Sequence, residues 1–182
     1  MPASHSRSRR TSVVGGWFFC GLVVLAVIGL MRPRAPRFLR LPGGGAAPTW
    51  EFTEVGGRKV GATPFVGQIV VLNFWATWCS PCIRELPELA AFQLAHVADG
   101  ITVIGASIDE FPDKALASFL AKSRPPYPVL VADLAAREIF GGVSQIPETW
   151  VINRDGRVTA RYLGPLDRAE LERAVAPLLG PR

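Results

Sequence analysis

Two cysteines separated by two residues form the most reactive pattern in this sequence. Cys79 and Cys82 enclose Ser80 and Pro81. Thiols at this spacing can close a small disulfide and exchange it with the disulfides of other molecules. The thiolate is the reactive form, and Cys-x-x-Cys sites lower the thiol pKa from about 8.5 to about 3.5–7. The pattern therefore predicts thiol–disulfide chemistry.

The residues around the pair predict where it lies in the fold. Ile69–Leu72 is a short, apolar, β-branched run that indicates a buried strand. After the cysteines, apolar residues recur at roughly helical spacing, and Pro81 falls in the first helical turn, where its missing N–H costs nothing. Cys79 is then expected at the helix N-terminus, where free N–H groups and the helix dipole favour its thiolate. We assign Cys79 as the nucleophile and Cys82, one turn inside the helix, as the resolving thiol.

A zinc half-site and an inert structural disulfide are the two alternatives to a redox-active cysteine pair. Structural zinc needs four ligands, whereas the chain has three Cys and two His. Cys20 lies in an apolar run and His5 in a basic tail, so only His96 is left as a further ligand. A structural disulfide would require neither the flanking tryptophans nor Pro81. We expect no metal, and no cofactor beyond the redox-active disulfide Cys79–Cys82.

The charge of the chain is unevenly distributed. Its 182 residues carry a formal net charge of +5, but seven arginines and no acidic residue precede position 41. The rest of the chain has thirteen basic and fifteen acidic side chains. The high isoelectric point thus belongs to the N-terminal segment, and we expect no nucleic-acid partner.

Composition divides the chain into four parts. Residues 1–12 are a basic tail, and Val13–Met31 is an uncharged run of nineteen residues, long enough to approach the roughly 30 Å hydrocarbon core of a bilayer. A cleavable signal peptide is the nearest alternative to a transmembrane anchor. Residues 32–48, rich in Pro, Gly and Arg, are expected to be a linker, and residues 49–182 a single domain. Flanking arginines are nearly balanced, so charge does not set the orientation.

The domain alternates predicted strands and helices. A hairpin is expected over 51–60, a helix over about 80–98, a strand over 101–108, a helix over 115–120, a strand over 127–131 and a short helix over 134–140. A second hairpin at Asp155–Gly156 and a helix capped by Asp167 and ending near Leu179 complete the pattern. Alternation followed by a hairpin predicts an α/β sandwich with a mixed sheet.

Three motifs resemble those of the thioredoxin-like family, and within it the membrane-anchored TlpA/ResA/DsbE-type disulfide reductases. They are Phe-Trp-Ala-Thr-Trp-Cys-Ser-Pro-Cys at 74–82, Ile-Pro-Glu-Thr at 146–149 and Asn-Arg-Asp-Gly at 153–156. The resemblance covers about residues 48–180. It implies a thioredoxin-like fold with a central mixed β-sheet flanked by helices, an N-terminal β-hairpin extension and an N-terminal transmembrane helix.

The resemblance also assigns roles to single residues. Ile146–Pro147 is similar to the family's cis-proline loop, which lies against the cysteine pair. Glu148 corresponds to a carboxylate that cytochrome-maturation relatives place near the cysteines, where it would raise the thiol pKa and relay protons; a solvated glutamate at a strand start is the alternative. Thioredoxin has a buried Asp at the position of Asn73, so Glu148 is the candidate for proton transfer. The residues expected to contact substrate are Trp78, Ser80, Pro81, Ile146 and Pro147.

These features predict a membrane-anchored thiol:disulfide oxidoreductase in the inner (cytoplasmic) membrane, with its catalytic domain on the extracytoplasmic side. Strong oxidants of the superfamily tend to have His before the second cysteine, whereas Pro81 is typical of reductants. The resemblance implies protein substrates with cysteine pairs, as in cytochrome c maturation, and a membrane thiol electron donor. The alternatives are a binding or chaperone module without turnover and a thiol peroxidase, whose Pro-x-x-x-Thr-x-x-Cys pattern is absent.

Overall fold

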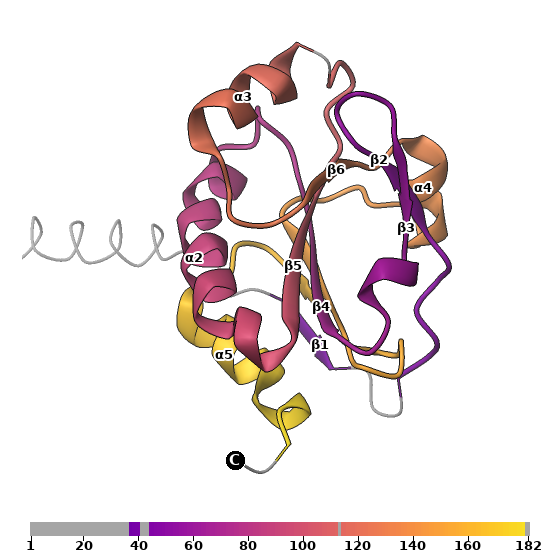
Figure 1. Ribbon diagram of the computed structural model, residues 1–182, viewed down its shortest axis with the longest axis vertical. Coiled ribbons are helices and arrows are strands. Elements are labelled where there is room, and N and C mark those ends of the chain that lie inside the picture. The colour runs from indigo at the N-terminus through magenta and orange to yellow at the C-terminus, as the bar shows by residue number, and fades with distance from the viewer. Residues whose placement is uncertain (1–36, 41–43, 113, 181–182) are drawn as a thin grey trace, which may run out of the picture. The chain divides into compact units, whose positions relative to one another are not determined.

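The strands of this protein form one mixed sheet with helices on both faces (Figure 1). The computed structural model describes residues 37–40, 44–112 and 114–180. The strand order is β1-β8-β7-β4-β5-β6-β2-β3, and β4–β5 and β5–β6 are the parallel pairs. The strands are β1 (Arg37–Arg40), β2 (Glu51–Thr53), β3 (Lys59–Gly61), β4 (Ile69–Trp75), β5 (Ile101–Ser107), β6 (Val129–Val131), β7 (Glu148–Ile152) and β8 (Val158–Leu163).

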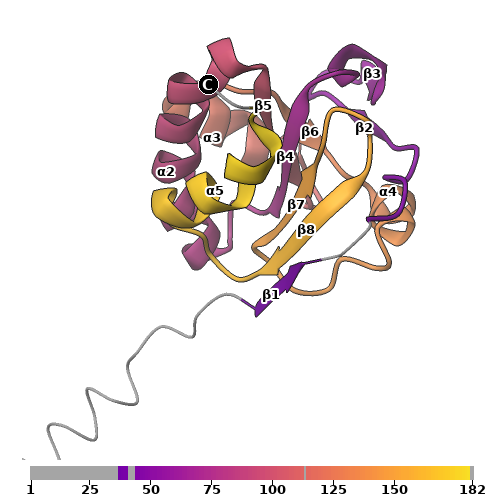
Figure 2. The same ribbon diagram turned by 90° about the horizontal axis from the view of Figure 1, so that it is seen from below.

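The helices are divided unequally between the two faces of the sheet. α2 (Ser80–His96), α3 (Ala115–Ser123) and α5 (Arg168–Val175) cover one face, and α4 (Leu134–Ile139) lies on the other (Figures 1 and 2). Short 3₁₀ turns occur at Thr63–Phe65, Val97–Asp99 and Ala176–Leu178. The last two turns end α2 and α5 earlier than their sequence patterns predict. The predicted cap of α5 is confirmed, because the Asp167 carboxylate accepts a hydrogen bond from the Glu170 N–H.

Strand β4 is the centre of the fold. All seven of its residues are buried, and it pairs with β5 on one side and β7 on the other. A strand covered on both faces is expected to be mostly apolar, which explains the apolar run that begins at Ile69; Asn73 is the polar residue of this strand. One apolar cluster joins β4 and β5 to α2 and α5, and a second joins them to α4 and the aromatic rings of Trp50 and Phe52.

The two predicted hairpins are both present. β2 pairs with β3 in the N-terminal extension, and β7 pairs with β8. In the loop between β7 and β8, Asn153 Oδ1 accepts hydrogen bonds from the backbone N–H groups of Asp155 and Arg157, and Gly156 adopts a positive φ of 72°. The Arg154 guanidinium donates to the carbonyls of Gly67 and Asp99, so this motif fastens the hairpin to the start of β4.

The N-terminal edge of the sheet differs from the sequence pattern. β1 pairs antiparallel with β8 from Arg37 to Arg40, inside the segment 32–48 that composition predicts to be a linker. Residues 1–36, including the predicted anchor Val13–Met31, lie outside the described residues. Within residues 37–40, 44–112 and 114–180, the helices are too short or too polar to cross a bilayer.

His96 joins the end of α2 to α5. Its Nδ1 lies 2.8 Å from an Asp99 carboxylate oxygen, and its Nε2 lies 2.8 Å from a Glu172 carboxylate oxygen. Burial alone would lower the His96 pKa, but the hydrogen bonds and charges of these two carboxylates outweigh burial and leave the pKa raised. In its charged form the ring donates to both partners.

Candidate active site

The cysteine pair lies where β4 ends and α2 begins. Cys79 and Cys82 form a disulfide with an S–S distance of 2.06 Å. Cys79 is the N-cap of α2, and its Sγ accepts a hydrogen bond from the Cys82 N–H at 3.3 Å. Cys79 is 5% exposed and Cys82 1%, so Cys79 is the thiol nearer to solvent, as we expect for a nucleophile. The helix start supplies the N–H group that would stabilise its thiolate.

The two tryptophans before the disulfide have different environments. Trp75 is buried at the end of β4, whereas Trp78 is 65% exposed. Ser80 is also exposed, and Pro81 is half-buried. The Ile146–Pro147 peptide bond is cis, as the resemblance predicts, and Ile146 packs against the apolar cluster that contains both cysteines. Since Glu148, the residue after Pro147, pairs with Phe74, the loop lies beside the end of β4, from which the cysteine turn follows.

Glu148 is tied into an ion pair. It is buried at the start of β7, and its Oε1 accepts hydrogen bonds from the Arg161 Nε–H at 2.7 Å and the Trp150 Nε1–H at 2.6 Å. The Arg161 guanidinium also lies 4.8 Å from the centre of the Trp150 ring. The alternative interpretation of Glu148 as a solvated glutamate at a strand start is therefore wrong. The predicted proton relay stays a prediction, and the paired oxygen argues for a structural carboxylate.

Glu85 is a second buried carboxyl, which the sequence reasoning missed. It lies three residues after Cys82 on the same buried face of α2 and is 2% exposed. Its Oε1 accepts from the Leu166 N–H at 3.1 Å, and its Oε2 has no partner among the described residues. Burial raises the pKa of Glu85 to about 8, although the Leu166 N–H and the nearby Asn73 amide favour the charged form. The signal for it in the sequence was a charged residue on the apolar face of the helix.

Asn73 links Glu85 to the proline loop. Its Nδ2 donates to Thr149 Oγ1 at 3.0 Å, and Thr149 lies two residues after Pro147. Asn73 cannot act as a base, so Glu85 is the buried carboxyl beside Asn73 that could take up or release a proton. A carboxyl with a pKa near 8 can exchange a proton with a thiol at neutral pH, because their proton affinities are similar.

A third carboxylate holds the turn before the disulfide. Asp109 accepts hydrogen bonds from the Thr77 N–H at 3.1 and 3.2 Å, from Thr77 Oγ1 at 2.6 Å and from Ser107 Oγ at 2.7 Å. Since Thr77 and Asp109 are 32 residues apart in sequence, this contact fixes the cysteine turn to the end of β5.

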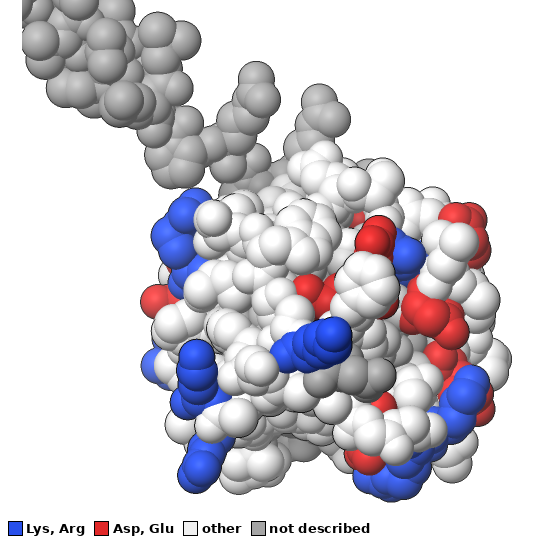
Figure 3. Space-filling view, turned by 90° about the horizontal axis from the view of Figure 1, so that it is seen from above, with Lys and Arg blue, Asp and Glu red and all other residues white. Residues whose placement is uncertain are grey.

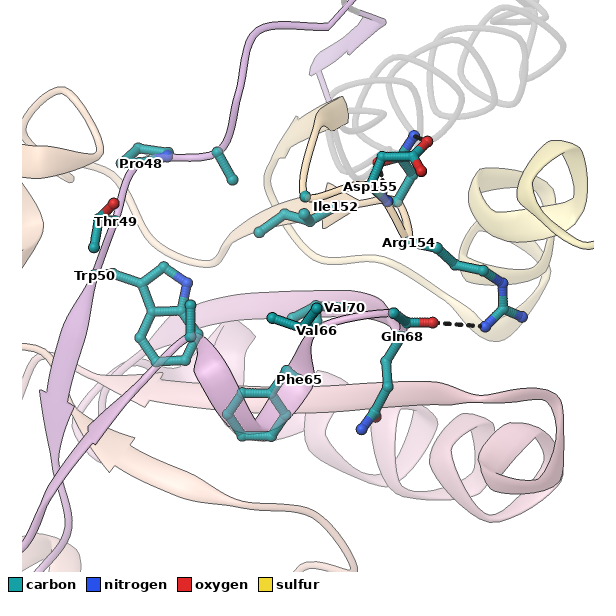
Figure 4. Close-up of a pocket in the computed structure, with 15 residues that line it drawn as sticks. Pro48, Thr49, Trp50, Phe65, Val66, Gln68, Val70, Ile152, Arg154 and Asp155 are labelled. Carbon is teal, nitrogen blue, oxygen red and sulfur yellow. Dashed lines mark hydrogen bonds between the residues drawn. The ribbon is translucent and has the colours of Figure 1, made fainter.

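A separate pocket lies at the other end of β4. It encloses about 350 Å³ between Trp50, Phe65, Val70 and the loop that contains Arg154. Figure 4 shows the Trp50 and Phe65 rings on one side and Arg154 on the other. It contains no thiol and lies near the start of β4, whereas the disulfide follows its last residue. The pocket is therefore not part of the dithiol site.

The charged surface shows no continuous basic field on the face viewed from above (Figure 3). Basic and acidic side chains are interspersed with uncharged surface there.

Comparison with known proteins relates the domain to thiol–disulfide enzymes. Residues 44–161 match the AhpC/TSA family. The chain is 38% identical over 114 residues to the thiol:disulfide interchange protein HelX of Rhodobacter capsulatus, with 62% of each protein covered. It is 30% identical over 131 residues to the thiol-disulfide oxidoreductase ResA of Bacillus anthracis, covering 71% of this chain and 74% of ResA. The crystal structure of a thioredoxin-family thiol:disulfide interchange protein from Chlorobium tepidum aligns with a TM-score of 0.67 and 28% identity, covering 75% of this chain and 97% of that one.

Proposed function

Because this chain belongs to the AhpC/TSA family and its relatives are thiol:disulfide oxidoreductases, we propose that it reduces disulfides in other proteins through Cys79 and Cys82. The observation that carries the proposal is the disulfide at the start of α2, with Cys79 capping the helix beside the exposed Trp78 ring. A purely structural disulfide would not require an exposed aromatic side chain such as Trp78 at the residue before Cys79.

The reaction proceeds by two exchanges at sulfur. The Cys79 thiolate attacks one sulfur of the substrate disulfide, and the other substrate sulfur leaves as a thiolate and takes up a proton. Cys82 then gives up its proton, attacks Cys79 Sγ and releases the second substrate thiolate. The protein ends as the Cys79–Cys82 disulfide, and the substrate has gained two electrons and two protons.

Glu85 is the group best placed to take the proton from Cys82. The two residues are neighbours on the buried face of α2, where water has little access. With a pKa of about 8, Glu85 is mostly protonated at neutral pH, but its carboxylate form is a much stronger base than a carboxylate of ordinary pKa near 4.5, and it exchanges protons readily near this pH. Glu148, by contrast, lies on β7 and is held in an ion pair with Arg161.

We infer the direction of catalysis from the residues between the cysteines. Pro81 precedes the second cysteine, as in the reducing members of the superfamily. Reduction potentials are about −270 mV for such reductants and about −120 mV for the strong oxidants. Equilibration of the protein with glutathione buffers, followed by quantitation of the Cys79–Cys82 disulfide, measures this potential. We expect a value near the reducing end, and a value near the oxidising end would reverse the proposed direction.

The substrate can be captured through the second cysteine. A Cys82→Ser variant cannot resolve the mixed disulfide, so it should accumulate covalent complexes with substrate proteins. Cys79→Ser is the matched control, because it lacks the nucleophile and should capture none. Equal capture by both variants would contradict the assignment of Cys79 as the nucleophile, and covalent capture by neither variant would leave a binding module without turnover as the better description. Failure of the wild-type protein to consume peroxide separates it from a thiol peroxidase.

We further propose that Val13–Met31 anchors the protein in the cytoplasmic membrane, with the domain outside. The support is the uncharged length of this segment and the need for a local reductant where thiols are oxidised. A membrane thiol donor would return the dithiol to its reduced state, and the substrates would be cysteine pairs such as those of apocytochromes c. The test is a membrane-impermeant thiol reagent on intact cells after mild reduction. Labelling of Cys79 only after lysis would place the domain in the cytosol.

A further inference from the structure

A groove lies beside the disulfide, between the cysteine turn and two loops from other parts of the chain. It has a volume of about 670 Å³. Its walls come from Thr77 and Trp78, from the segment 108–111 that follows β5, and from Val143 and Ser144, which precede the cis-proline loop. A molecule bound in it would contact Trp78, the residue that precedes Cys79. The volume is suited to one or two side chains of a polypeptide rather than to a folded domain.

Two exposed aromatic rings line this groove. Trp78 is 65% exposed and Phe111 is 75% exposed, although most large apolar side chains of the described residues are buried. The two residues belong to different segments, so apolar surface approaches the groove from two sides. Covering such rings is favourable because it removes apolar area from water. An apolar side chain of a partner can do this.

The charged groups of the groove differ in how they are satisfied. Asp109 has both oxygens occupied by donors from Thr77 and Ser107. Glu110 is exposed, so water can solvate it. Arg137 of α4 is different, because its side chain lines the groove and its guanidinium has no ion pair among the described residues. A carboxylate bound in the groove would give this guanidinium an ion-pair partner through charge-assisted hydrogen bonds.

We propose that this groove binds the substrate polypeptide beside its reactive cysteine, with an apolar side chain between Trp78 and Phe111 and a carboxylate side chain on Arg137. The guanidinium fork matches the two oxygens of a carboxylate, which a neutral amide does not. The protein thus selects disulfides whose flanking sequence is apolar and acidic. This inference rests on the proposed reductase function, because it assigns the substrate class of the same dithiol.

The test uses disulfide-bonded peptides that differ at one position. Three peptides carry Leu-Asp, Leu-Asn or Leu-Lys beside one cysteine, and the reduced full-length protein is mixed with each at low ionic strength. We expect the Asp peptide to be reduced about threefold to tenfold faster than the Asn peptide, as for a partly buried ion pair. Arg137→Gln should abolish this ratio, and Arg137→Glu should favour the Lys peptide. Glu110→Gln, a matched loss of charge in the same groove, should keep or increase the preference for Asp.

Each ratio compares peptides on one protein, so partial unfolding of a variant cancels. Equal rates for the Asp and Asn peptides on the wild-type protein, or a preference that survives Arg137→Gln, would overturn the inference. Reduction of a small aromatic disulfide reports the exchange chemistry alone. If the wild-type protein reduces that compound but shows no peptide preference, the groove proposal fails and the reductase function stands.

A binding measurement covers the case in which no disulfide is reduced. A Cys79→Ser/Cys82→Ser variant is titrated calorimetrically with the same peptides carrying Ser in place of Cys. We expect tighter binding of the Asp peptide, and weaker binding of all three peptides when Phe111→Ser is added. Absence of both effects would show that the groove does not recognise such a segment, whatever the redox activity.

Discussion

Replacement of Glu85 by glutamine isolates the pH dependence that this buried carboxyl confers on the fold. Glutamine keeps the shape of the side chain, and its oxygen can still accept the Leu166 N–H, but it cannot ionise. In the oxidised protein Cys79 and Cys82 are joined and do not titrate. The difference in stability between the two oxidised proteins therefore reports Glu85 alone, and the His96 ion pair is common to both.

The magnitude follows from the two protonation equilibria. Glu85 has a pKa of about 8 in the folded protein against an ordinary value of 4.5. Between these values the folded chain keeps the proton and the unfolded chain has lost it, so wild-type stability falls as pH rises. The favourable contribution is complete below pH 4.5 and is lost by the time pH passes through 8. At about 1.4 kcal/mol per pKa unit, wild-type loses about 3 kcal/mol by pH 7 and about 5 kcal/mol above pH 8.

The assay is urea denaturation of both oxidised proteins at about pH 5, 7 and 8.5, with stability taken from the linear extrapolation. Glu85→Gln should equal the wild-type protein to within about 1 kcal/mol at the lowest pH and exceed it by several kcal/mol at the highest. A stability difference that stays constant over this range would refute the assignment of a raised pKa to Glu85. A difference of the opposite sign would mean that the carboxylate has a cationic partner in solution.

Three further outcomes are expected. Iodoacetamide at neutral pH should label Cys79 before Cys82 in the reduced protein, and mass spectrometry of the peptides detects the order; first labelling of Cys82 would exchange their roles. Arg161→Met should destabilise the fold by about 3 kcal/mol in urea denaturation, because it leaves Glu148 buried without its cation, and adding Glu148→Gln should restore part of the loss. His96→Gln should cost more stability at about pH 6 than at about pH 9. Because the pKa of His96 is raised in the folded protein, the charged ring stabilises the fold fully when pH is below the pKa of histidine in the unfolded chain, and this stabilisation is lost as pH rises through the pKa of the folded state. Equal costs at both pH values would contradict a charged His96.

The elements that position the dithiol follow from local patterns. The apolar run that begins at Ile69, the proline after Ser80 and the helical spacing that follows predict a strand, a helix start and a cysteine pair between them, as observed. The β7–β8 hairpin and the cap at Asp167 are predicted equally well. Their causes act over a few residues, through backbone conformation, capping and periodic burial, so neighbours in the sequence contain the information.

Strand β1 shows where composition misleads. The segment 32–48 is rich in Pro and Gly, which favour a linker, yet Arg37–Arg40 adds to the edge of the sheet beside β8. Pairing at an edge depends on a free row of backbone groups on a strand more than a hundred residues away. The sequence around residues 37–40 contains no information about the free backbone groups of that distant strand.

The partners and the burial of the carboxyl groups near the site were determined by the tertiary structure alone. In the sequence, Glu148 is part of a motif that resembles the family's, and Glu85 has the sequence context of a residue on a helix surface. In the fold, Arg161 forms an ion pair with Glu148, and Glu85 is buried away from water. The partner of Glu85 is the backbone of Leu166, 81 residues away, and Arg161 reaches Glu148 across a hairpin. The sequence by itself therefore indicated which two cysteines form the disulfide and where they lie on the chain. The protonation of their surroundings was determined by the fold, because a pKa depends on distance, burial and charge in three dimensions.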